Sequence, residues 1–529
     1  MSECDAGMIA QDERAIIDIG SNTVRLVIFG GPVRAPVTLH NEKVSARLGK
    51  AVAEGGALSD KAMRQALDAL ARYALILRMR GVTDVQCVAT AAARDATNGA
   101  AFLRRIEALG LKPRLLSGEE EAIAAARGVM AGFPGARGVA ADLGGGSLEL
   151  IDVDGERCTH GISLPLGTLR LPGLRLGGAA RFGRRVKKMM RAADWAGAHG
   201  QTLYLVGGSW RALARFAMLR MDWPVDDPHG FALSAEEALR LARTVAGRKP
   251  AVLRELLARE RRGAVRRGKI ARAMVGDESD MLPDPHIGGI DIPQARMNAM
   301  PDAAALLAVL VRVLKPGRLV FSAWGLREGL LASAAAAPLA GDAADPLLAG
   351  VRAFVMGEDP RALANGDAVL AWTAAVVPAG DAALERVRRA AVWLALASLR
   401  AEPNLRLQLA VHWALRKRWI GLSAEERAML AVVILANSGR TAVPGELARV
   451  ASPARLRQAV AWGLAVRLCR RMGGGTGAAL AGTTLSAGVE SLVLTTGGEQ
   501  AVLVNDAAEK DLRLLGECLG LSVAIRRGA

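Results

Sequence analysis

The chain has 529 residues, enough for about three or four domains of ordinary size. Hydrophobic residues make up 51% of the sequence, which excludes a chain that is disordered over most of its length. The formal net charge of +17 favours an anionic partner such as nucleic acid, an acidic membrane surface or a polyphosphate compound. A generally Arg-rich composition explains the same charge without any such partner.

The low aromatic content argues against a nucleic-acid partner. Only 4% of the residues are aromatic, including 2 Tyr and 8 Phe, whereas binding of single strands usually depends on aromatic stacking. The sequence also shows no spacing typical of an RNA-recognition motif, a helix-turn-helix or a zinc finger. We therefore expect no nucleic-acid partner.

The cysteines and apolar segments indicate a cytoplasmic protein. The five cysteines are scattered singly, so neither a disulfide framework nor a zinc site is expected (Cys4, Cys87, Cys158, Cys469 and Cys518). Residues 1–14 contain acidic side chains and no apolar segment typical of a signal peptide. The Leu-rich run after Ala303 meets Arg312 and Pro316, so we expect no membrane partner.

The first third of the chain alternates strand-like and helical patterns. Residues 15–18 and 24–29 are predicted strands separated by the turn Gly20-Ser21-Asn22. Ser59 is placed to cap a helix, and further strands are expected at 85–89 and near 114–116. This alternation predicts an α/β domain.

A similar pattern then begins again. Residues 138–142 and 148–153 are strand-like and flank a second glycine turn, Gly144-Gly145-Gly146-Ser147. Further strands are expected at 202–206 and 319–322, and residues 243–272 form a basic helical stretch. The two strand–turn–strand units resemble each other and predict two related domains.

The rest of the chain has a different character. Ala-rich segments such as 331–340 and 390–399 predict an all-α region to about residue 440. The tail combines a predicted helix at 454–468 with predicted strands at 491–496 and 501–505. We place the four domains at residues 12–122, 123–335, 336–445 and 446–529.

Each of the two glycine turns follows an aspartate at the end of a predicted buried strand, Asp18 in the first unit and Asp142 in the second. Glycines let backbone N–H groups approach an anion closely, and an aspartate at a strand end is placed to hold a divalent cation beside phosphates. One such turn alone is more typical of a plain hairpin. Two copies favour a phosphorylated ligand in a cleft between two domains.

Several motifs in order resemble one known family. The segments IIDIGSNTVRLVIF and GVAADLGGGSLELI look like the phosphate-binding turns of the actin/hexokinase-type superfamily. Together with ATAAARDATN at 89–98, LSGEEEA at 116–122, VGGSW at 206–210 and GLREGL at 325–330, they resemble the exopolyphosphatase/guanosine pentaphosphate phosphatase family. The resemblance covers residues 12–335 well. It implies two actin-like (ribonuclease H-like) α/β domains around a cleft.

The resemblance also implies roles for individual residues. Glu121 matches the catalytic base that activates water, Asp142 and Glu149 match acids that support the water and a divalent cation, and Arg94 matches a phosphate clamp. Asp18 joins Asp142 and Glu149 as an expected ligand of Mg²⁺. The expected phosphate-cradling residues are Ser21, Asn22, Gly144, Gly145, Gly146, Ser147, Gly208 and Ser209.

Ordinary structural roles compete with these assignments. Glu119, Glu120 and Glu121 also suit the acidic first turn of a helix after Ser117, with Glu120 as the better capping residue. Arg94 also suits an exposed surface position, and Glu149 suits the solvent face of its strand. Residues 325–330 are interpreted as packing or a hinge, without chemistry.

The helical region resembles an HD-type domain without its metal ligands. None of the six histidines is followed by Asp, so we interpret His412 as a packing residue and the domain as a scaffold or dimer-forming element. The small C-terminal domain is expected to be α+β. We expect a homodimer.

The leading function is Mg²⁺-dependent exopolyphosphatase activity on inorganic polyphosphate. Hydrolysis of guanosine pentaphosphate at the same centre is the closest alternative, followed by a non-catalytic sensor of polyphosphate or alarmone nucleotides and an ATP-dependent kinase of the same superfamily. Candidate cations for a basic track along the substrate are Arg184, Arg185, Lys187, Lys188 and the 261–269 cluster.

Overall fold

The computed structural model describes residues 13–155, 157–193, 199–275, 292–333, 341–403 and 405–527. Their contacts divide the chain into two compact units. The first contains the described residues up to Met221, those from Pro228 to Arg261 and those from 292 to 333. The second contains Asp222–Asp227, the described residues 262–275 at the end of a long helix, and the described residues from Gly341 onward.

The first sheet of the first unit has the order β3-β2-β1-β4-β5. Its strands are β1 (Arg14–Ile19), β2 (Val24–Gly30), β3 (Val37–Val44), β4 (Asp84–Ala89) and β5 (Pro113–Leu115). The central strand β1 is antiparallel to β2 and parallel to β4. The predicted strands are thus confirmed, and β3 was missed because its mostly polar, exposed sequence lacks an apolar strand pattern.

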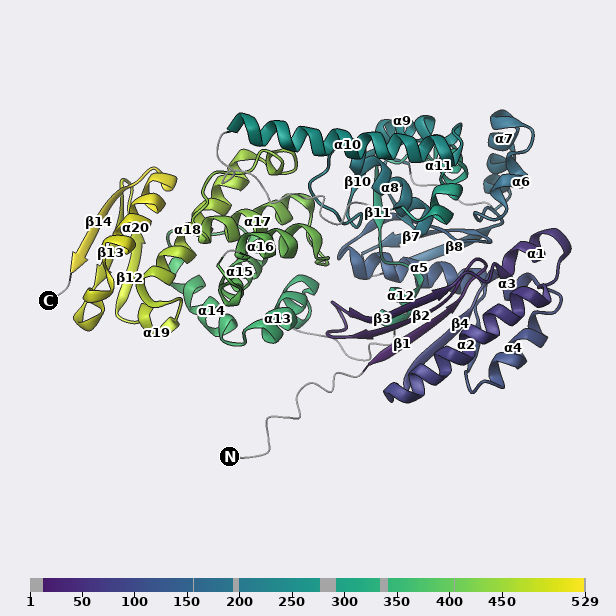
Figure 1. Ribbon diagram of the computed structural model, residues 1–529, viewed down its shortest axis with the longest axis horizontal. Coiled ribbons are helices and arrows are strands. Elements are labelled where there is room, and N and C mark those ends of the chain that lie inside the picture. Colours follow the sequence, from purple (N-terminus) through teal and green to yellow (C-terminus); the bar gives the residue numbers. More distant parts are fainter. Residues whose placement is uncertain are drawn as a thin grey trace. The chain divides into compact units, whose positions relative to one another are not determined.

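Helices α1 (Leu48–Gly55), α2 (Asp60–Arg80), α3 (Ala91–Asp95) and α4 (Gly99–Glu107) accompany this sheet (Figure 1). The predicted cap of α2 is confirmed, because the Ser59 side chain accepts a hydrogen bond from the backbone N–H of Ala62. Its apolar face, including Leu67 and Leu70, is buried in one core with Ile17 and Leu26 of the sheet. The core therefore fixes β1, and with it the position of Asp18.

The second sheet has the order β10-β11-β9-β6-β7-β8. Its strands are β6 (Arg137–Leu143), β7 (Leu148–Asp154), β8 (Arg157–Leu164), β9 (Thr202–Val206), β10 (Ala232–Ser234) and β11 (Arg318–Ser322). Here β6 is antiparallel to β7 and parallel to β9, as β1 is to β2 and β4. The predicted similarity of the two strand–turn–strand segments is therefore confirmed, because both sheets of the first unit share this topology.

The helices of this second domain follow its strands. They are α5 (Gly118–Gly132), α6 (Leu171–Arg175), α7 (Gly178–Ala192), α8 (Gly208–Arg220), α9 (Ala235–Ala246), α10 (Pro250–Val275), α11 (Gln294–Leu314) and α12 (Leu326–Ser333). In the described part of the chain, α11 alone has the length and apolar composition to cross a bilayer. Since 67% of its most apolar window is buried inside the fold, α11 has the character of a core helix.

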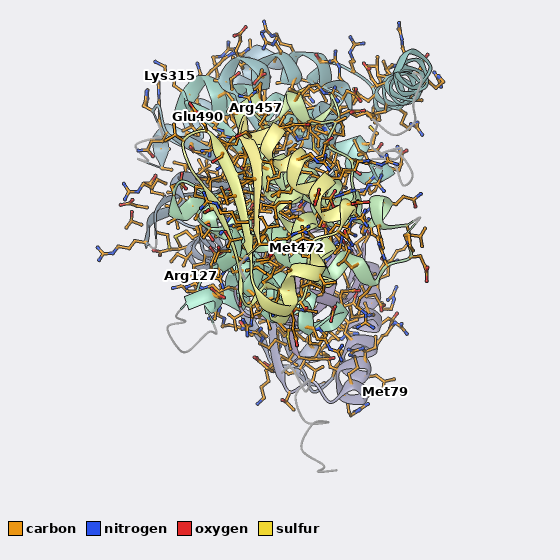
Figure 2. The ribbon with its side chains drawn as sticks, turned by 90° about the vertical axis from the view of Figure 1, so that its left-hand side faces the viewer. Met79, Arg127, Lys315, Arg457, Met472 and Glu490 are labelled. Carbon is orange, nitrogen blue, oxygen red and sulfur yellow. The ribbon has the colours of Figure 1, made fainter. Side chains whose placement is uncertain are left out.

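The second unit is helical up to residue 480 and ends in a small sheet. Its helices are α13 (Pro346–Glu358), α14 (Arg361–Thr373), α15 (Ala382–Ala397), α16 (Arg406–Val411), α17 (Ala424–Asn437), α18 (Pro453–Gly473), α19 (Gly477–Leu480) and α20 (Asp506–Leu519). Strands β12 (Thr483–Ala487), β13 (Ser491–Thr496) and β14 (Ser522–Arg527) pair in that order. Figure 2 shows this sheet in yellow, with Glu490 in the turn between β12 and β13.

Two predictions for the second unit are wrong. The expected strand at 501–505 overlaps a 3₁₀ turn at Gly498–Leu503, because a glycine pair precedes it and its apolar run is too short to pair. His412 is exposed where the helix becomes a π-helical turn at His412–Arg416, so it is not a packing residue. The cysteines of the described residues are free, as expected.

Candidate functional site

A cavity of about 150 Å³ lies between the two α/β domains of the first unit. Both glycine turns contribute to its wall, together with the N-terminal ends of α5, α8 and α12. Of the predicted site residues, it is lined by Asp18, Ser21, Asn22, Glu121, Asp142, Gly144, Gly145, Gly146, Ser147 and Gly208. The fold thus brings together residues that lie up to 190 positions apart in the sequence.

The two glycine turns have the same internal geometry and touch each other. In each turn the first glycine donates its N–H to the carbonyl three residues later, from Gly20 to Thr23 and from Gly144 to Ser147, both at 3.0 Å. A Cβ placed on Gly146 would lie 2.8 Å from Oγ of Ser21. A side chain at 146 would therefore force Ser21 to shift, so glycine here favours the close approach of the two turns.

A neighbouring segment occupies the carbonyl groups of the second turn. The N–H groups of Thr168 and Leu169 donate to the carbonyls of Gly144 and Gly145 at 3.0 and 2.9 Å. With these carbonyls already engaged by a neighbouring segment, the backbone of the turn is suited to offer its N–H donors to an anion.

Asp18 and Asp142 occupy equivalent positions near the ends of β1 and β6. Burial raises the pKa of both carboxyl groups, that of Asp142 to about 6. The positive charge of Arg327 opposes this effect at both groups. Ionising either carboxyl group in this buried position therefore costs free energy, a condition common at functional sites.

In the first turn of α5, one glutamate caps the helix and the next one lines the cavity. The N–H of Ser117 donates to Oε2 of Glu120 at 2.8 Å, and the N–H of Glu120 donates to Oγ of Ser117 at 3.1 Å. Glu120 is thus the exposed capping residue, as expected. Glu121 is only 9% exposed and lines the cavity.

Arg94 lies beside Glu121. Its Nη1 atom is 3.4 Å from Oε2 of Glu121 and donates to the carbonyl of Leu116 at 3.0 Å. Burial raises the pKa of Glu121 to about 7, with Arg94 opposing the rise and Asp142 adding to it. A carboxylate with this pKa is suited to accept a proton near neutral pH.

Four arginines that sequence reasoning missed also line the cavity, namely Arg25, Arg211, Arg296 and Arg327. Burial, together with the nearby charge of Arg327, lowers the pKa of Arg25 to about 10. Burial likewise lowers the pKa of Arg296. Crowded and partly desolvated guanidinium groups of this kind favour binding of a multiply charged anion.

The comparisons with known proteins agree with this geometry. Residues 30–265 match the model of the Ppx/GppA phosphatase family. This part of the chain is a Ppx/GppA family domain. The matched residues include Glu121 and Asp142, whereas Asp18 and Arg327 lie outside them.

Curated relatives match over part of their length. Exopolyphosphatase 1 of Mycobacterium tuberculosis is 31% identical over 163 residues, which are 30% of this chain and 46% of the relative. Exopolyphosphatase 1 of Mycobacterium leprae is 30% identical over 163 residues, 30% of this chain and 47% of the relative. The chain thus spans about half the length of the curated relatives it matches.

Two solved structures align with about three fifths of this chain. The Aquifex aeolicus member of the Ppx/GppA family is 23% identical, with a TM-score of 0.48, covering 61% of this chain and 96% of that one. An exopolyphosphatase from Cytophaga hutchinsonii is 22% identical, with a TM-score of 0.48, covering 60% and 96%.

Two predicted site residues of the Ppx/GppA domain lie behind the cavity wall. Glu149 is 1% exposed and accepts a hydrogen bond from Oγ of Ser163 at 2.9 Å, so it does not face solvent on its strand. Burial raises its pKa, and the neighbouring Glu121 adds to the rise. The Ser209 hydroxyl is fully buried without a hydrogen-bond partner, so its side chain does not reach the cavity.

The predicted three-carboxylate metal site is not assembled. In the residues that the structure describes, no group of three or more His, Cys, Asp or Glu side chains is placed to hold a metal ion. Asp18 and Asp142 line the cavity, but Glu149 does not. Mg²⁺ commonly uses one or two carboxylates and takes its remaining ligands from water and substrate phosphates, so Asp18 and Asp142 suit such an ion.

Residues 325–330, interpreted from the sequence as packing or a hinge without chemistry, pack against α5 and also contribute to the cavity wall. A Cβ on Gly329 would overlap the carbonyl of Ala124 in α5, which confirms a packing role for that glycine. Arg327 and Glu328 from the same segment nevertheless line the cavity. Two sequence features could have indicated these cavity residues: the adjacent charges of Arg327 and Glu328 between two glycines, and the charged Arg25 within the apolar strand β2.

Proposed function

We propose that this chain is an exopolyphosphatase that hydrolyses terminal phosphoanhydride bonds of inorganic polyphosphate and releases orthophosphate. The observation that carries the proposal is Glu121, a buried carboxyl group with a pKa near 7, in a cavity that also holds the two glycine turns and four arginines. The mycobacterial relatives, both named Exopolyphosphatase 1, support the same substrate.

Glu121 serves as the general base in this proposal. Its carboxylate accepts a proton from a water molecule as the water attacks the terminal phosphorus, and the bond to the bridging oxygen of the chain breaks. Arg94 holds the carboxylate from one side through the 3.4 Å contact.

The cavity arginines and the glycine turns stabilise the charge of the transferred phosphoryl group. Phosphoryl transfer needs little covalent help from the protein, and positioning together with electrostatic stabilisation supplies most of the rate. Arg25 and Arg296 are suited to grip non-bridging oxygens, because both are largely withdrawn from water. The backbone of Gly145 and Gly146 approaches without side-chain obstruction.

Mg²⁺ would be held by Asp18 and Asp142, together with substrate oxygens and water. When bound, the ion supplies neutralisation of the negative charge that builds up between the terminal phosphate and the leaving oxygen. The raised pKa values of the two aspartates are consistent with a site that becomes more stable when a cation joins them.

The decisive comparison sets two substrates against each other in one phosphate-release assay with Mg²⁺. The proposal expects long-chain polyphosphate to be hydrolysed with the higher kcat/KM, and guanosine pentaphosphate with the lower one. Hydrolysis of guanosine pentaphosphate but not of polyphosphate would show that the nucleotide is the substrate and would contradict the proposal. Binding of either compound without any phosphate release would indicate a sensor.

A further inference from the structure

Helix α7 carries a strongly basic surface. The helix has 15 residues, none of them acidic. Its five exposed cations are Arg181, Arg184, Lys187, Lys188 and Arg191. Within the described part of the chain, none of the five has a carboxylate oxygen within 4.0 Å, although Arg175 just before them pairs with Asp302. We call these five residues the α7 basic face.

The spacing within the α7 basic face places like charges next to one another. Arg184 and Lys188 are four residues apart, as are Lys187 and Arg191, so each pair is adjacent on the helix surface. Such pairs repel and weaken a helix unless an anion lies between them. Along the helix axis, the face extends over about 15 Å from Arg181 to Arg191.

The opposite side of α7 anchors it to the domain. Phe182, Val186 and Met190 are buried, and Gly183 approaches Val309 of α11. Nη1 of Arg185 donates to the carbonyl of Leu174 at 3.3 Å, which ties α7 to α6 (Figure 1). The basic face is therefore presented by a fixed helix.

The same stretch of chain also reaches the cavity. Thr168 lines the cavity, and its N–H is bound to the carbonyl of Gly144 at 3.0 Å. Helix α7 begins ten residues later, after the buried Leu171 and the short helix α6. A substrate too long for a cavity of about 150 Å³ must continue outside it, and α7 offers it a basic surface.

We propose that the α7 basic face binds the part of a long polyphosphate chain that extends beyond the cavity. This inference rests on the proposed function and names the substrate class as long-chain polyphosphate. The only aromatic residue of α7 is the buried Phe182, so α7 provides no stacking surface for nucleic-acid bases. Its large apolar side chains at 182, 186 and 190 are also buried, and half-buried Met189 alone is too little apolar surface to enter a lipid surface.

The test compares substrates of different length. Replacing Arg184, Lys187, Lys188 and Arg191 by Gln removes four charges and keeps good helix-forming residues of similar length. We expect KM for long-chain polyphosphate to rise about ten-fold at low salt, with KM for tripolyphosphate unchanged, since a short substrate stays in the cavity. An unchanged KM for the long chain would overturn the proposal.

A matched control removes four exposed cations elsewhere in the same unit. Lys61 and Arg64 on α2, with Arg104 and Arg105 on α4, are exposed and are replaced by Gln in the control variant. This variant has the same net charge as the α7 variant and should keep the parental KM for the long chain. An equal rise in both variants would show a general effect of net charge and would overturn the assignment to α7.

Direct binding separates this proposal from the proposed function. If the parent protein hydrolyses neither substrate, the proposed function fails, and binding of labelled long-chain polyphosphate to parent and α7 variant is then measured. An about tenfold loss of binding in the α7 variant would still support binding of polyphosphate by the α7 basic face. If the variant instead loses binding only to double-stranded DNA or to phosphatidylserine vesicles, the track for polyphosphate is refuted.

Discussion

Nη1 of Arg94 lies 3.4 Å from Oε2 of Glu121 and bonds to the carbonyl of Leu116 at 3.0 Å, so the guanidinium is fixed against the candidate base. Arg94 does not itself line the cavity, and whether it also clamps phosphate stays a prediction. In this geometry Arg94 acts on Glu121 by holding its carboxylate and by lowering its pKa against the effect of burial.

Arg94→Gln should shift the pH dependence of activity upward. Removing the positive charge leaves burial and the charge of Asp142 acting on Glu121, so its pKa should rise further above 7. The acid limb of the kcat/KM profile should move by about one pH unit, and Arg94→Lys should move it less. An Arg94→Gln profile that coincides with the parental one would rule out this role.

Gly208→Ala should impair substrate binding more than folding. A Cβ at this position would overlap the guanidinium carbon of Arg296, which is the far end of a flexible side chain that can move away. We expect KM for polyphosphate to rise with little change in Tm. Gly329→Ala is the contrasting variant, because its Cβ would meet the Ala124 backbone and should cost about 1–3 kcal/mol of stability. Equal Tm losses in both variants would contradict this distinction.

Ser209→Ala should leave activity unchanged. The Ser209 hydroxyl is buried without a partner, so its removal costs no hydrogen bond and disturbs no group at the cavity. Ser147→Ala, at a residue that lines the cavity, should reduce kcat/KM. Steady-state kinetics of the two variants under identical conditions test the contrast, and the reverse order of effects would disprove it.

Glu121→Gln should stabilise the folded protein at neutral and alkaline pH. The pKa of Glu121 is raised from 4.5 to about 7 on folding, so the folded state keeps a proton that the unfolded state has lost. Stability therefore falls as pH rises from about 4.5 to 7, by roughly 3 kcal/mol at most, and the Gln variant avoids this loss. Its Tm without Mg²⁺ should exceed the parental Tm at about pH 8 and match it at about pH 4. A lower Tm at about pH 8 would contradict the raised pKa.

Glu120→Gln provides a control of opposite sign. The backbone hydrogen bond from Ser117 lowers the pKa of Glu120, so its ionised form contributes stability above the unfolded pKa of 4.5, and this contribution is lost as pH falls through the lower folded value. Its replacement should therefore give no stabilisation at about pH 8.

The sequence allowed most of the first unit to be predicted. Strands such as β1 and β9 are short apolar runs that end in glycine turns, and the repeated Asp–Gly pattern anticipated two sheets of the same topology. The strands that were missed are edge strands, such as β3 and β12, whose exposed residues carry no apolar alternation. Their pairing is decided by the neighbouring strand instead of their own sequence.

The site could be predicted only in part, because spacing along the sequence does not determine whether a side chain reaches the cavity or is buried behind its wall. The motifs gave Glu121 and both glycine turns, but they did not distinguish Ser147 at the cavity wall from Ser209 behind it. Arg296 was not recognised because it comes from α11, almost 90 positions after Gly208, and reaches the cavity only through tertiary packing. The side chains of most of the 261–269 cluster lie outside the described residues, so that part of the predicted track stays a prediction.

The most direct test of the account is orthophosphate release from long-chain polyphosphate with Mg²⁺ by the parent, Glu121→Gln and Glu120→Gln. The two variants change neighbouring carboxylates by the same chemistry, but only Glu121 lines the cavity. We predict that Glu121→Gln lowers kcat by about 10² to 10⁴ while still binding polyphosphate, and that Glu120→Gln keeps the parental rate. A Glu121→Gln variant that hydrolyses polyphosphate as fast as the parent would contradict the account.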